Sequence, residues 1–387
     1  MATRLSDSNV DDSVRIAHIV ADGRPGGGST VVLGLIDEMA RNGGMSITLI
    51  SEPRSYLEEQ ARRLGVEFVG CNLFTGWFDP TPPWRLLQAL GPRRFDLAHL
   101  HGLRAAHHAV RCPLRARLGR LVYTIHGLHQ LHAPQPVRAL ANVVERQVMQ
   151  RVDVPVFVSR ADLESARQWA LLPAQSAATV IWNGIDVDAI DAHARVERRF
   201  DVIFVGRHVE QKQPLLAARV LAALAAGGWR CAMAGGGPLE ADCRAELART
   251  AGGTAVEVLG ELPHAAALDA LAGSRVVVMP SAWEGLPVLP LEAMALGVPV
   301  VASNVAGIAE VMGADCGVLV EPDDETGFER AVEAVLTDAE LENRLRRAGA
   351  QRVRAYFQRS GTSARYRGIY DQLLGAIPVQ GRPHDAS

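Results

Sequence analysis

The segment from Val276 to Gly307 constrains the fold more than any other part of this sequence. Two short apolar runs, Val276–Met279 and Pro299–Ala302, are separated by a loop at 281–287 and a helical segment at Leu289–Leu296. Strand, loop, helix and strand in this order form the βαβ unit of a parallel sheet. The segment therefore predicts an α/β fold whose ligands bind at the carboxyl ends of the strands.

Two glutamates with seven residues between them give this unit its chemistry. Glu284 lies in the loop after the first strand, and Glu292 lies in the first turns of the helix. Backbone N–H groups in those turns have no partner within the helix. N–H donors flanked by two carboxylates suit a ligand with both phosphate and hydroxyl groups, such as a sugar nucleotide. The spacing alone leaves open two solvated glutamates on an ordinary βαβ unit.

The residues around the glutamates read E-G-L-P-x-x-x-L-E-A-M-A-x-G-x-P-V-V-A. This pattern resembles the signature of the retaining glycosyltransferases of family 4, which have the GT-B fold. The resemblance covers about residues 15–375, strongly in the second half and moderately in the first. It implies an α/β protein with two Rossmann-like domains facing each other across a cleft, and a sugar-nucleotide donor bound mainly to the second domain.

The length of 387 residues fits two α/β domains, and 48% hydrophobic residues can fill two cores. A polar stretch after the N-G-I-D turn marks the expected boundary. We expect a flexible tail at 1–14, an acceptor domain at 15–187, a linker at 188–199, a donor domain at 200–360, a helix crossing back to the first domain at 361–376, and a tail at 377–387.

Composition narrows the partners and the compartment. The net charge of −3 provides no basic field, which argues against nucleic acid. Five scattered cysteines without ligand spacing are typical of reduced cytosolic thiols. Residues 1–14 lack the apolar core of a secretory signal, and no stretch approaches about 18 uninterrupted apolar residues. These features predict a soluble cytoplasmic protein.

A glycine-rich loop at 21–29 leads from the first predicted strand into a helix. Its consecutive glycines let the backbone approach a ligand, and Ser29 or Thr30 can cap the helix. A tight turn without a ligand is the alternative. In the resembled family a loop at this place faces the donor phosphates, which implies that Gly26 and Gly27 bind the donor.

Two predicted strands, Asp96–Leu100 and Leu121–Ile125, each deliver a histidine followed by glycine. His101 and His126 should therefore point into one crevice, although either could be a structural histidine. The family has D-x-x-H-x-H-G and T-x-H-G at these places, and the resemblance implies that His126 contacts or orients the donor sugar.

Arg207 and Lys212 follow the first strand of the second domain. A guanidinium and an ammonium suit a diphosphate, although both could be surface charges. The family assigns the same R-x4-K pair to the donor diphosphate. The run His126, His129, His132 is a weak metal pattern without a carboxylate partner. Because Arg207 and Lys212 can meet the diphosphate charge, we expect no metal or other cofactor.

The resemblance assigns roles to the remaining site residues. Glu292 would bind the ribose hydroxyls, and Glu284 would meet the donor sugar. The backbone at Gly285, Leu286 and Pro287 would lie near the phosphate or the sugar hydroxyls, with Leu286 as the chief N–H donor. Glu284 as a covalent nucleophile stays open, since carboxylates take that role in retaining glycosidases. The family's mechanism implies instead a front-face transfer assisted by the leaving phosphate.

Five arginines without an acid occupy the stretch from Gly102 to Arg120: Arg104, Arg111, Arg115, Arg117 and Arg120. Such a face could dock on an anionic membrane, with the aromatic residues Phe74, Trp77 and Phe78 inserting nearby. It could equally bind the protein's own acids or line an acceptor cleft. Peripheral binding at the inner face of the membrane would make the acceptor a lipid-linked saccharide.

The predicted function is therefore transfer of a sugar to a saccharide or a lipid-linked saccharide, in cell-surface polysaccharide or glycolipid biosynthesis. Two alternatives remain. One is a sugar-nucleotide epimerase or hydrolase on the same fold, and the other is a non-catalytic sugar-nucleotide-binding subunit. The sequence leaves open the donor base, the sugar, the acceptor and the oligomeric state.

Overall fold

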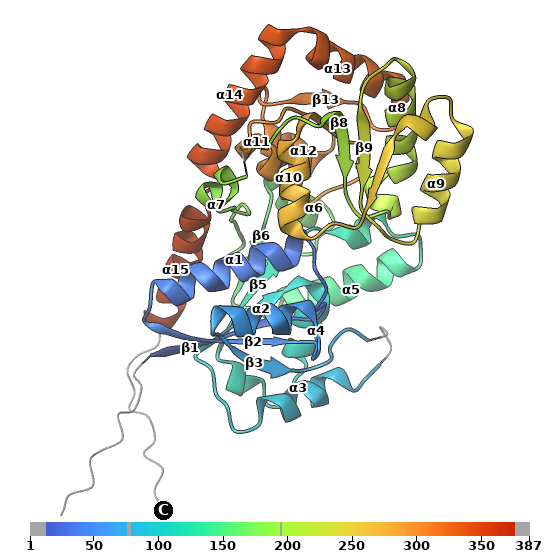
Figure 1. Ribbon diagram of the computed structural model, residues 1–387. Helices are drawn as coiled ribbons and strands as arrows, with labels where there is room; N and C mark the ends of the chain where they lie inside the picture. The colour runs from blue at the N-terminus through green and yellow to red at the C-terminus, as the bar shows by residue number, and fades with distance from the viewer. Residues whose placement is uncertain (1–12, 76–78, 194–195, 376–387) are drawn as a thin grey trace, which may run out of the picture.

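The computed structural model describes residues 13–75, 79–193 and 196–375, which form two α/β domains, one stacked on the other (Figure 1). Each domain is built on a parallel sheet covered by helices. The first sheet has seven strands in the order β3-β2-β1-β4-β5-β6-β7, and the second has six in the order β10-β9-β8-β11-β12-β13. The predicted two-domain α/β fold is confirmed.

The elements of the first domain alternate between strand and helix, as the sequence periodicity predicts. They are β1 Val14–Val20, α1 Gly27–Arg41, β2 Met45–Ser51, α2 Tyr56–Leu64, β3 Glu67–Gly70, α3 Pro82–Leu90, β4 Leu97–His101, α4 Gly102–Val110, β5 Arg120–Ile125, α5 Val137–Met149, β6 Val154–Phe157, α6 Arg160–Gln168 and β7 Thr179–Val180.

The second domain repeats this alternation after the short helix α7, Val187–Asp191. Its elements are β8 Phe200–Val205, α8 Pro214–Ala226, β9 Cys231–Ala234, α9 Glu240–Arg249, β10 Glu257–Gly260, α10 His264–Ala272, β11 Ser274–Met279, α11 Leu289–Ala295, β12 Val300–Ser303, α12 Ala306–Met312, β13 Val318–Val320, α13 Glu325–Thr337 and α14 Ala339–Tyr356. A last helix, α15 Arg359–Gly375, follows.

The strand orders fix where ligands can bind. In the first sheet the chain order reverses between β1 and β4, and in the second it reverses between β8 and β11. At such switch points the loops from the carboxyl ends of neighbouring strands diverge and open a crevice. The glycine loop follows β1, Arg207 and Lys212 follow β8, and Glu284 follows β11. The predicted site residues thus cluster at the two switch points.

Two local details differ from the sequence prediction. Helix α1 begins at Gly27, so Ser29 and Thr30 lie inside its first turn and do not cap it. Their hydroxyls donate to the Gly26 carbonyl instead, at 2.8 and 3.1 Å. The first residues of the expected linker belong to α7, because the Asp186 carboxylate accepts from the Ala189 N–H at 3.0 Å and caps that helix.

The C-terminal helices connect the domains (Figure 1). Helix α14 packs on α11 of the second domain, whereas α15 packs on α1 of the first. Tyr366 and Tyr370 of α15 are buried in the core of the first domain. The chain therefore returns to its first domain after completing the second.

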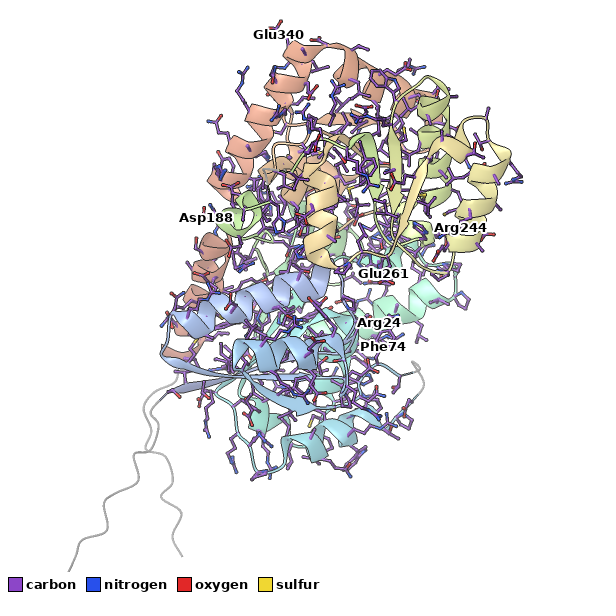
Figure 2. The ribbon with its side chains drawn as sticks, viewed as in Figure 1. Arg24, Phe74, Asp188, Arg244, Glu261 and Glu340 are labelled. Carbon is purple, nitrogen blue, oxygen red and sulfur yellow. The ribbon has the colours of Figure 1, made fainter. Side chains whose placement is uncertain are left out.

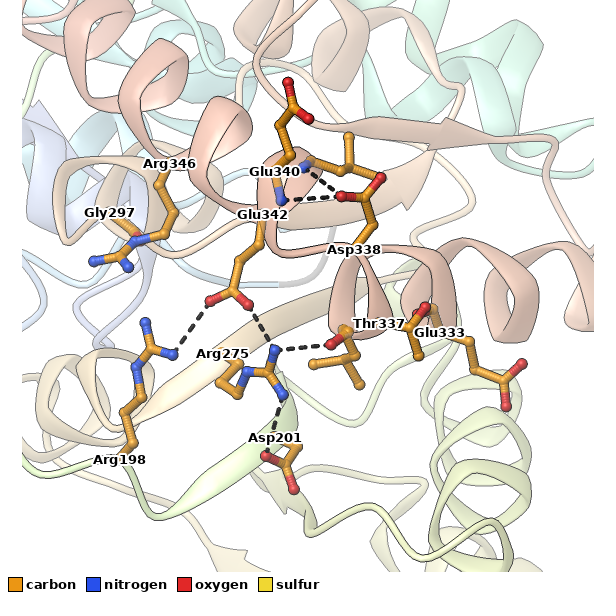
Figure 3. Close-up of polar contacts among 12 residues, drawn as sticks. Arg198, Asp201, Arg275, Gly297, Glu333, Thr337, Asp338, Glu340, Glu342 and Arg346 are labelled. Carbon is orange, nitrogen blue, oxygen red and sulfur yellow. Dashed lines mark hydrogen bonds and ion pairs between the residues drawn. The ribbon is translucent and has the colours of Figure 1, made fainter.

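A buried carboxylate fixes α14 to the second sheet. Glu342 accepts hydrogen bonds from Arg198 at 3.2 Å and from Arg275 at 2.6 Å, and Arg275 also faces Asp201 at 3.9 Å (Figure 3). Burying a carboxylate is costly unless it is paired and hydrogen-bonded. This network therefore satisfies Glu342 at the end of the domain that lies away from the cleft.

Candidate active site

Glu284 and Lys212 form an ion pair at the switch point of the second sheet. Lys212 lies in the loop after β8 and Glu284 in the loop after β11, so the reversal of strand order brings them together. The Glu284 side chain is 6% exposed and the Lys212 side chain 21%. Gln211 donates to the other carboxylate oxygen at 3.3 Å. Both oxygens of Glu284 are therefore engaged, and its charge is neutralised by the ammonium that the sequence assigned to phosphate.

Close backbone contacts hold the Glu284 loop between the two domains. A Cβ on Gly285 would lie 2.7 Å from the His126 carbonyl oxygen, and one on Gly307 would lie 2.1 Å from the Gly285 oxygen. Only glycine permits this approach. The Asn183 side-chain amide also donates to the Leu286 carbonyl at 2.8 Å. Residues of the first domain thus fix the loop that carries Glu284.

Glu292 is buried in the first turn of α11 and is paired with a residue that the sequence analysis did not select. His264, the first residue of α10, lies 2.7 Å from the Glu292 carboxylate. The hydrogen bond to Glu292 raises the pKa of His264 above its usual value and outweighs the opposing effect of burial. His264 therefore restrains one oxygen of the carboxylate assigned to ribose.

The two glutamates line different pockets between the domains. Glu292 lines a pocket of about 270 Å³ together with Thr30, Val31 and His264. Glu284 lines another of about 260 Å³, with Asp162 and His129 of the first domain. In this second pocket His132 stacks on Trp283 with ring centroids 4.8 Å apart. The fold therefore places one of the two carboxylates in each pocket.

The glycine loop reaches the second domain. A Cβ on Gly27 would lie 3.7 Å from the Val288 side chain, so the N-terminus of α1 faces the start of α11. Gly26 is the residue preceding that helix. The first N–H groups of α1 have no partner within the helix, and such a terminus favours an anion. Leu286 and Pro287 are buried beside it.

Arg207 is exposed beside the cleft, and its side chain makes no hydrogen bond or ion pair to the described residues. Its positive charge acts on Asp22 of the first domain. Burial would raise the pKa of Asp22, but hydrogen bonds from Arg24 and the charges of Arg24 and Arg207 lower it. Arg207 therefore presents a guanidinium that is free to contact a ligand where the two domains meet. Figure 2 shows Arg24 at this edge of the first domain, facing Glu261 of the second.

The predicted pairing of His101 and His126 is present. His101 ends β4 and His126 follows β5, and a nitrogen of one ring lies 3.3 Å from a nitrogen of the other. The sequence analysis missed two neighbours, His18 of β1 and His99 of β4, both fully buried. His99 and His101 face the same side of the sheet because they lie two residues apart on one strand, a signal available from their spacing. His18 joins them only because β1 pairs with β4, with His18 opposite His99.

The arginine-rich stretch does not form one basic face. Arg104 donates to the Thr75 carbonyl, Arg115 to the Arg151 carbonyl, Arg117 to the Gly91 carbonyl and Arg120 to Asp153, whereas Arg111 is exposed. Within the part of the chain that the structure describes, no helix is long and apolar enough to cross a bilayer. Most of these arginines therefore bind their own chain.

Phe74 is 39% exposed and lies between two guanidiniums. Arg104 lies 4.4 Å and Arg24 5.2 Å from the centre of its ring. Figure 2 shows Phe74 beside Arg24 at the edge of the first domain. Trp77 and Phe78 lie outside the described residues. The two guanidiniums therefore hold Phe74 at the edge of the first domain, with part of its ring exposed.

The His264–Glu292 pair predicts a pH-dependent stability. The stabilisation that protonated His264 gives is complete below its unfolded pKa and is lost as pH rises through the raised folded pKa. We expect His264→Gln to lower the unfolding free energy by about 0.5 kcal/mol at pH 5.5, the size of a solvent-exposed pair, and by less at pH 9. Urea unfolding at both values measures this, and an equal loss at both would contradict it.

Solved structures share this two-domain architecture. A sucrose-phosphate synthase from Thermosynechococcus elongatus matches with a TM-score of 0.77 and 18% identity, covering 94% of this chain and 100% of that one. The Anabaena protein HepE, in complex with UDP and glucose, matches with a TM-score of 0.77 and 16% identity, covering 94% and 99%. At these identities the likeness shows the fold, and this chain is a two-domain α/β protein with the GT-B fold.

The family is shown by the sequence. The family "Glycosyltransferase Family 4" matches residues 25–189, and "Glycosyl transferases group 1" matches residues 188–352. The chain therefore belongs to the family 4 glycosyltransferases.

Curated relatives agree with this assignment. The glycogen synthase of Mycobacterium tuberculosis is 28% identical in an alignment of 273 positions that covers 68% of this chain and 66% of that protein. The phosphatidyl-myo-inositol mannosyltransferase of Mycobacterium leprae is 27% identical in an alignment of 354 positions that covers 86% of this chain and 89% of that protein. The match with the glycogen synthase thus spans about two thirds of that protein's length.

Proposed function

We propose that the protein transfers a glycosyl group from a nucleoside diphosphate sugar to a saccharide or a lipid-linked saccharide, without a metal and with retention at the anomeric carbon. The observation that carries the proposal is the division of the two glutamates between two interdomain pockets. Glu292 would take the ribose hydroxyls in one pocket, and Glu284 would take the hydroxyls of the transferred sugar in the other. The diphosphate would lie between them, beside the α1 N-terminus, Arg207 and Lys212.

Donor binding would then exchange the partners of Lys212. The ammonium is neutralised by Glu284 in the free protein. A diphosphate offers it a stronger anion, and the sugar hydroxyls offer Glu284 new donors. Lys212 and Arg207 would stabilise the negative charge that develops on the leaving diphosphate, which is transition-state stabilisation.

We assign Glu284 to binding of the transferred sugar and not to covalent attack. Both of its carboxylate oxygens accept hydrogen bonds in the free protein, from Lys212 and from Gln211. In the donor complex, sugar hydroxyls would replace the Lys212 bond. Retention would then follow from attack of the acceptor on the same face as the departing diphosphate, whose oxygen takes the acceptor's proton.

The partner exchange has a direct test, because Lys212 is the only lysine among the 387 residues. Reductive methylation with ¹³C-formaldehyde labels the Lys212 amine and the chain's amino terminus, and it keeps the charge of the ammonium. We expect the Lys212 signal to move when UDP-glucose or another donor binds. A signal that stays in place at saturating donor would contradict the assignment.

The donor and the stereochemistry need two further measurements. A thermal-shift panel of UDP, GDP, ADP and their sugars identifies the base, because a ligand at 100 times its Kd stabilises the folded state by about 2.7 kcal/mol. UDP-glucose comes first, since HepE is seen with UDP and glucose. Proton NMR of the product then reads its anomeric configuration, and inversion would contradict retention. Free sugar or an epimerised donor as the product would favour the hydrolase or epimerase alternatives.

A lipid-linked acceptor requires a membrane-facing surface, for which Arg111 is the best candidate. It is the exposed arginine of the stretch, and each basic residue near an anionic surface is worth about 1 kcal/mol. We expect salt-sensitive co-sedimentation with phosphatidylserine vesicles that Arg111→Glu weakens by about fivefold or more. Arg347→Glu, which reverses an exposed charge on α14, is the matched control. Equal binding by both variants would contradict a membrane role for this stretch.

A further inference from the structure

His126, His101 and His18 form a row of hydrogen-bonded rings that leads from the cleft into the first domain. A His126 nitrogen, Nε2, lies 3.3 Å from His101 Nδ1, and His101 Nε2 lies 3.0 Å from His18 Nδ1. His126 is partly exposed, His101 is 6% exposed and His18 is fully buried. Only the first ring of the row can therefore reach a ligand in the cleft.

All three rings are neutral at physiological pH. Burial lowers the pKa of His18 to about 3 and that of His126 to about 4, and it holds the pKa of His101 well below its usual value. A neutral imidazole has one N–H donor and one bare acceptor nitrogen. Two hydrogen bonds in series therefore couple the three tautomers, and the proton position on any ring sets the other two.

The inner end of the row selects the direction. His18 Nε2 is buried and has no hydrogen-bond partner among the described residues. If each ring carried its proton on Nε2, His18 Nε2 would be a buried N–H donor without an acceptor. Native structures tolerate such a donor less than an unpaired acceptor. If each ring carries its proton on Nδ1, His18 Nε2 is only an unpaired acceptor. In that case His18 Nδ1–H donates to His101, and His101 Nδ1–H donates to His126 Nε2.

We propose that His18 and His101 are positioning residues that hold His126 in its Nδ1–H tautomer, so that the one nitrogen left free is a donor toward the nucleotide sugar. This rests on the proposed function. The His126 backbone packs against Gly285, next to Glu284. An N–H at this place can serve a phosphate or sugar oxygen. A bare nitrogen could accept only from a hydroxyl and would repel the phosphate.

A metal centre explains the same residues less well. Ligand atoms of His18, His99 and His101 all lie within 4.8 Å of one another. However, His99 Nδ1 is 2.5 Å from the Tyr370 hydroxyl and His99 Nε2 is 2.6 Å from the Thr124 hydroxyl. Both nitrogens of His101 are used by the row. A cation would have to break these bonds in a buried site where no carboxylate hydrogen-bonds the three described rings.

The direct test is ¹⁵N NMR of the ligand-free full chain with labelled histidine, which needs no donor. We expect the proton on Nδ1 of His126, His101 and His18. A proton on Nε2 of His126 would overturn the proposal. So would a stoichiometric zinc ion found by elemental analysis, because a metal-bound nitrogen carries no proton. Since this readout is independent of turnover, it stands even if the proposed reaction proves wrong.

Two ring-conserving variants test the consequence for turnover. His101→Phe removes both hydrogen bonds of the row. His99→Phe removes two other hydrogen bonds in the same buried cluster, to Tyr370 and Thr124, and keeps an aromatic ring against His101. Fixing the catalytic histidine of a serine protease in the wrong tautomer lowers kcat by about 10⁴. His101→Phe would leave the His126 tautomer unrestrained instead of inverted, so we expect a smaller loss of kcat, about tenfold. The donor KM should stay within about twofold of the wild-type value. His99→Phe should keep both values and the His126 tautomer. Equal losses in the two variants with UDP-glucose would overturn the positioning role. If either fails to fold, the wild-type NMR decides.

Discussion

Lys212→Ala is expected to lower both stability and turnover, for separable reasons. The substitution leaves the Glu284 carboxylate 6% exposed and without its countercharge. Removing one partner of a buried ion pair lowers the free energy of unfolding by about 3–5 kcal/mol. Because Lys212 is partly exposed and Gln211 still donates to Glu284, we expect a loss of about 2–3 kcal/mol here. Loss of the charge-assisted contact with the diphosphate should lower kcat/KM by a further 1.5–3 kcal/mol, about tenfold to 150-fold.

The double variant Lys212→Ala/Glu284→Gln separates the two effects. With no buried charge left, we expect chemical denaturation to show most of the lost stability recovered. Turnover should stay as low as in Lys212→Ala or fall further, because neither the phosphate contact nor the carboxylate is restored. Arg344→Ala, which truncates an exposed cation on α14, is the control for loss of a positive charge. Recovery of turnover in the double variant would show that Lys212 acts on stability alone.

The second large effect distinguishes the two glutamates. Glu284→Gln should lower kcat by about tenfold or more, because the pocket that Glu284 lines would hold the reacting sugar. Glu292→Gln should mainly raise the donor KM, because ribose contacts are the same in the ground and transition states. Steady-state kinetics with the donor identified by thermal shift measures both.

Each glutamate also has an intramolecular partner, so the controls must remove that partner alone. His264→Ala leaves Glu292 without its imidazole partner, and Gln211→Ala removes a weaker bond to Glu284. We expect each control to change kcat and the donor KM less than the substitution of the glutamate that it contacts. The same kinetic profile for Glu284→Gln and Glu292→Gln would contradict the division of the site into two pockets.

Local pattern in the sequence was enough to predict the fold and most of the candidate site. Alternating apolar runs and amphipathic segments predicted parallel sheets. The helical segment predicted at Leu289–Leu296 corresponds to α11, which is followed by Gly297 at a left-handed φ of +68°. Arg207, Lys212 and Glu284 follow strands of a parallel sheet, and such residues gather at one edge. The resemblance around Glu284 and Glu292 then indicated the family, which the comparisons confirm.

Other features could not be predicted, because they depend on which distant segments meet. The Glu284–Lys212 pair joins loops 72 residues apart, and the His264–Glu292 pair joins helices 28 apart. The arginine-rich stretch looked like one basic face, but helix α4 and the turns after it point its side chains at different carbonyls. Composition counts charges, whereas the fold decides where each charged side chain points and what it contacts.

The sequence by itself determined the two-domain α/β architecture, the family and the loops that carry the predicted site residues, because these follow from local periodicity and short motifs. Only the tertiary structure decided that the two glutamates line separate pockets and that Asn183 of the first domain holds the Glu284 loop of the second. It also decided that His18 and His101 continue the hydrogen bonding of His126. Strand order and domain packing set these contacts, since they bring together residues whose separation along the chain carries no mark of their proximity.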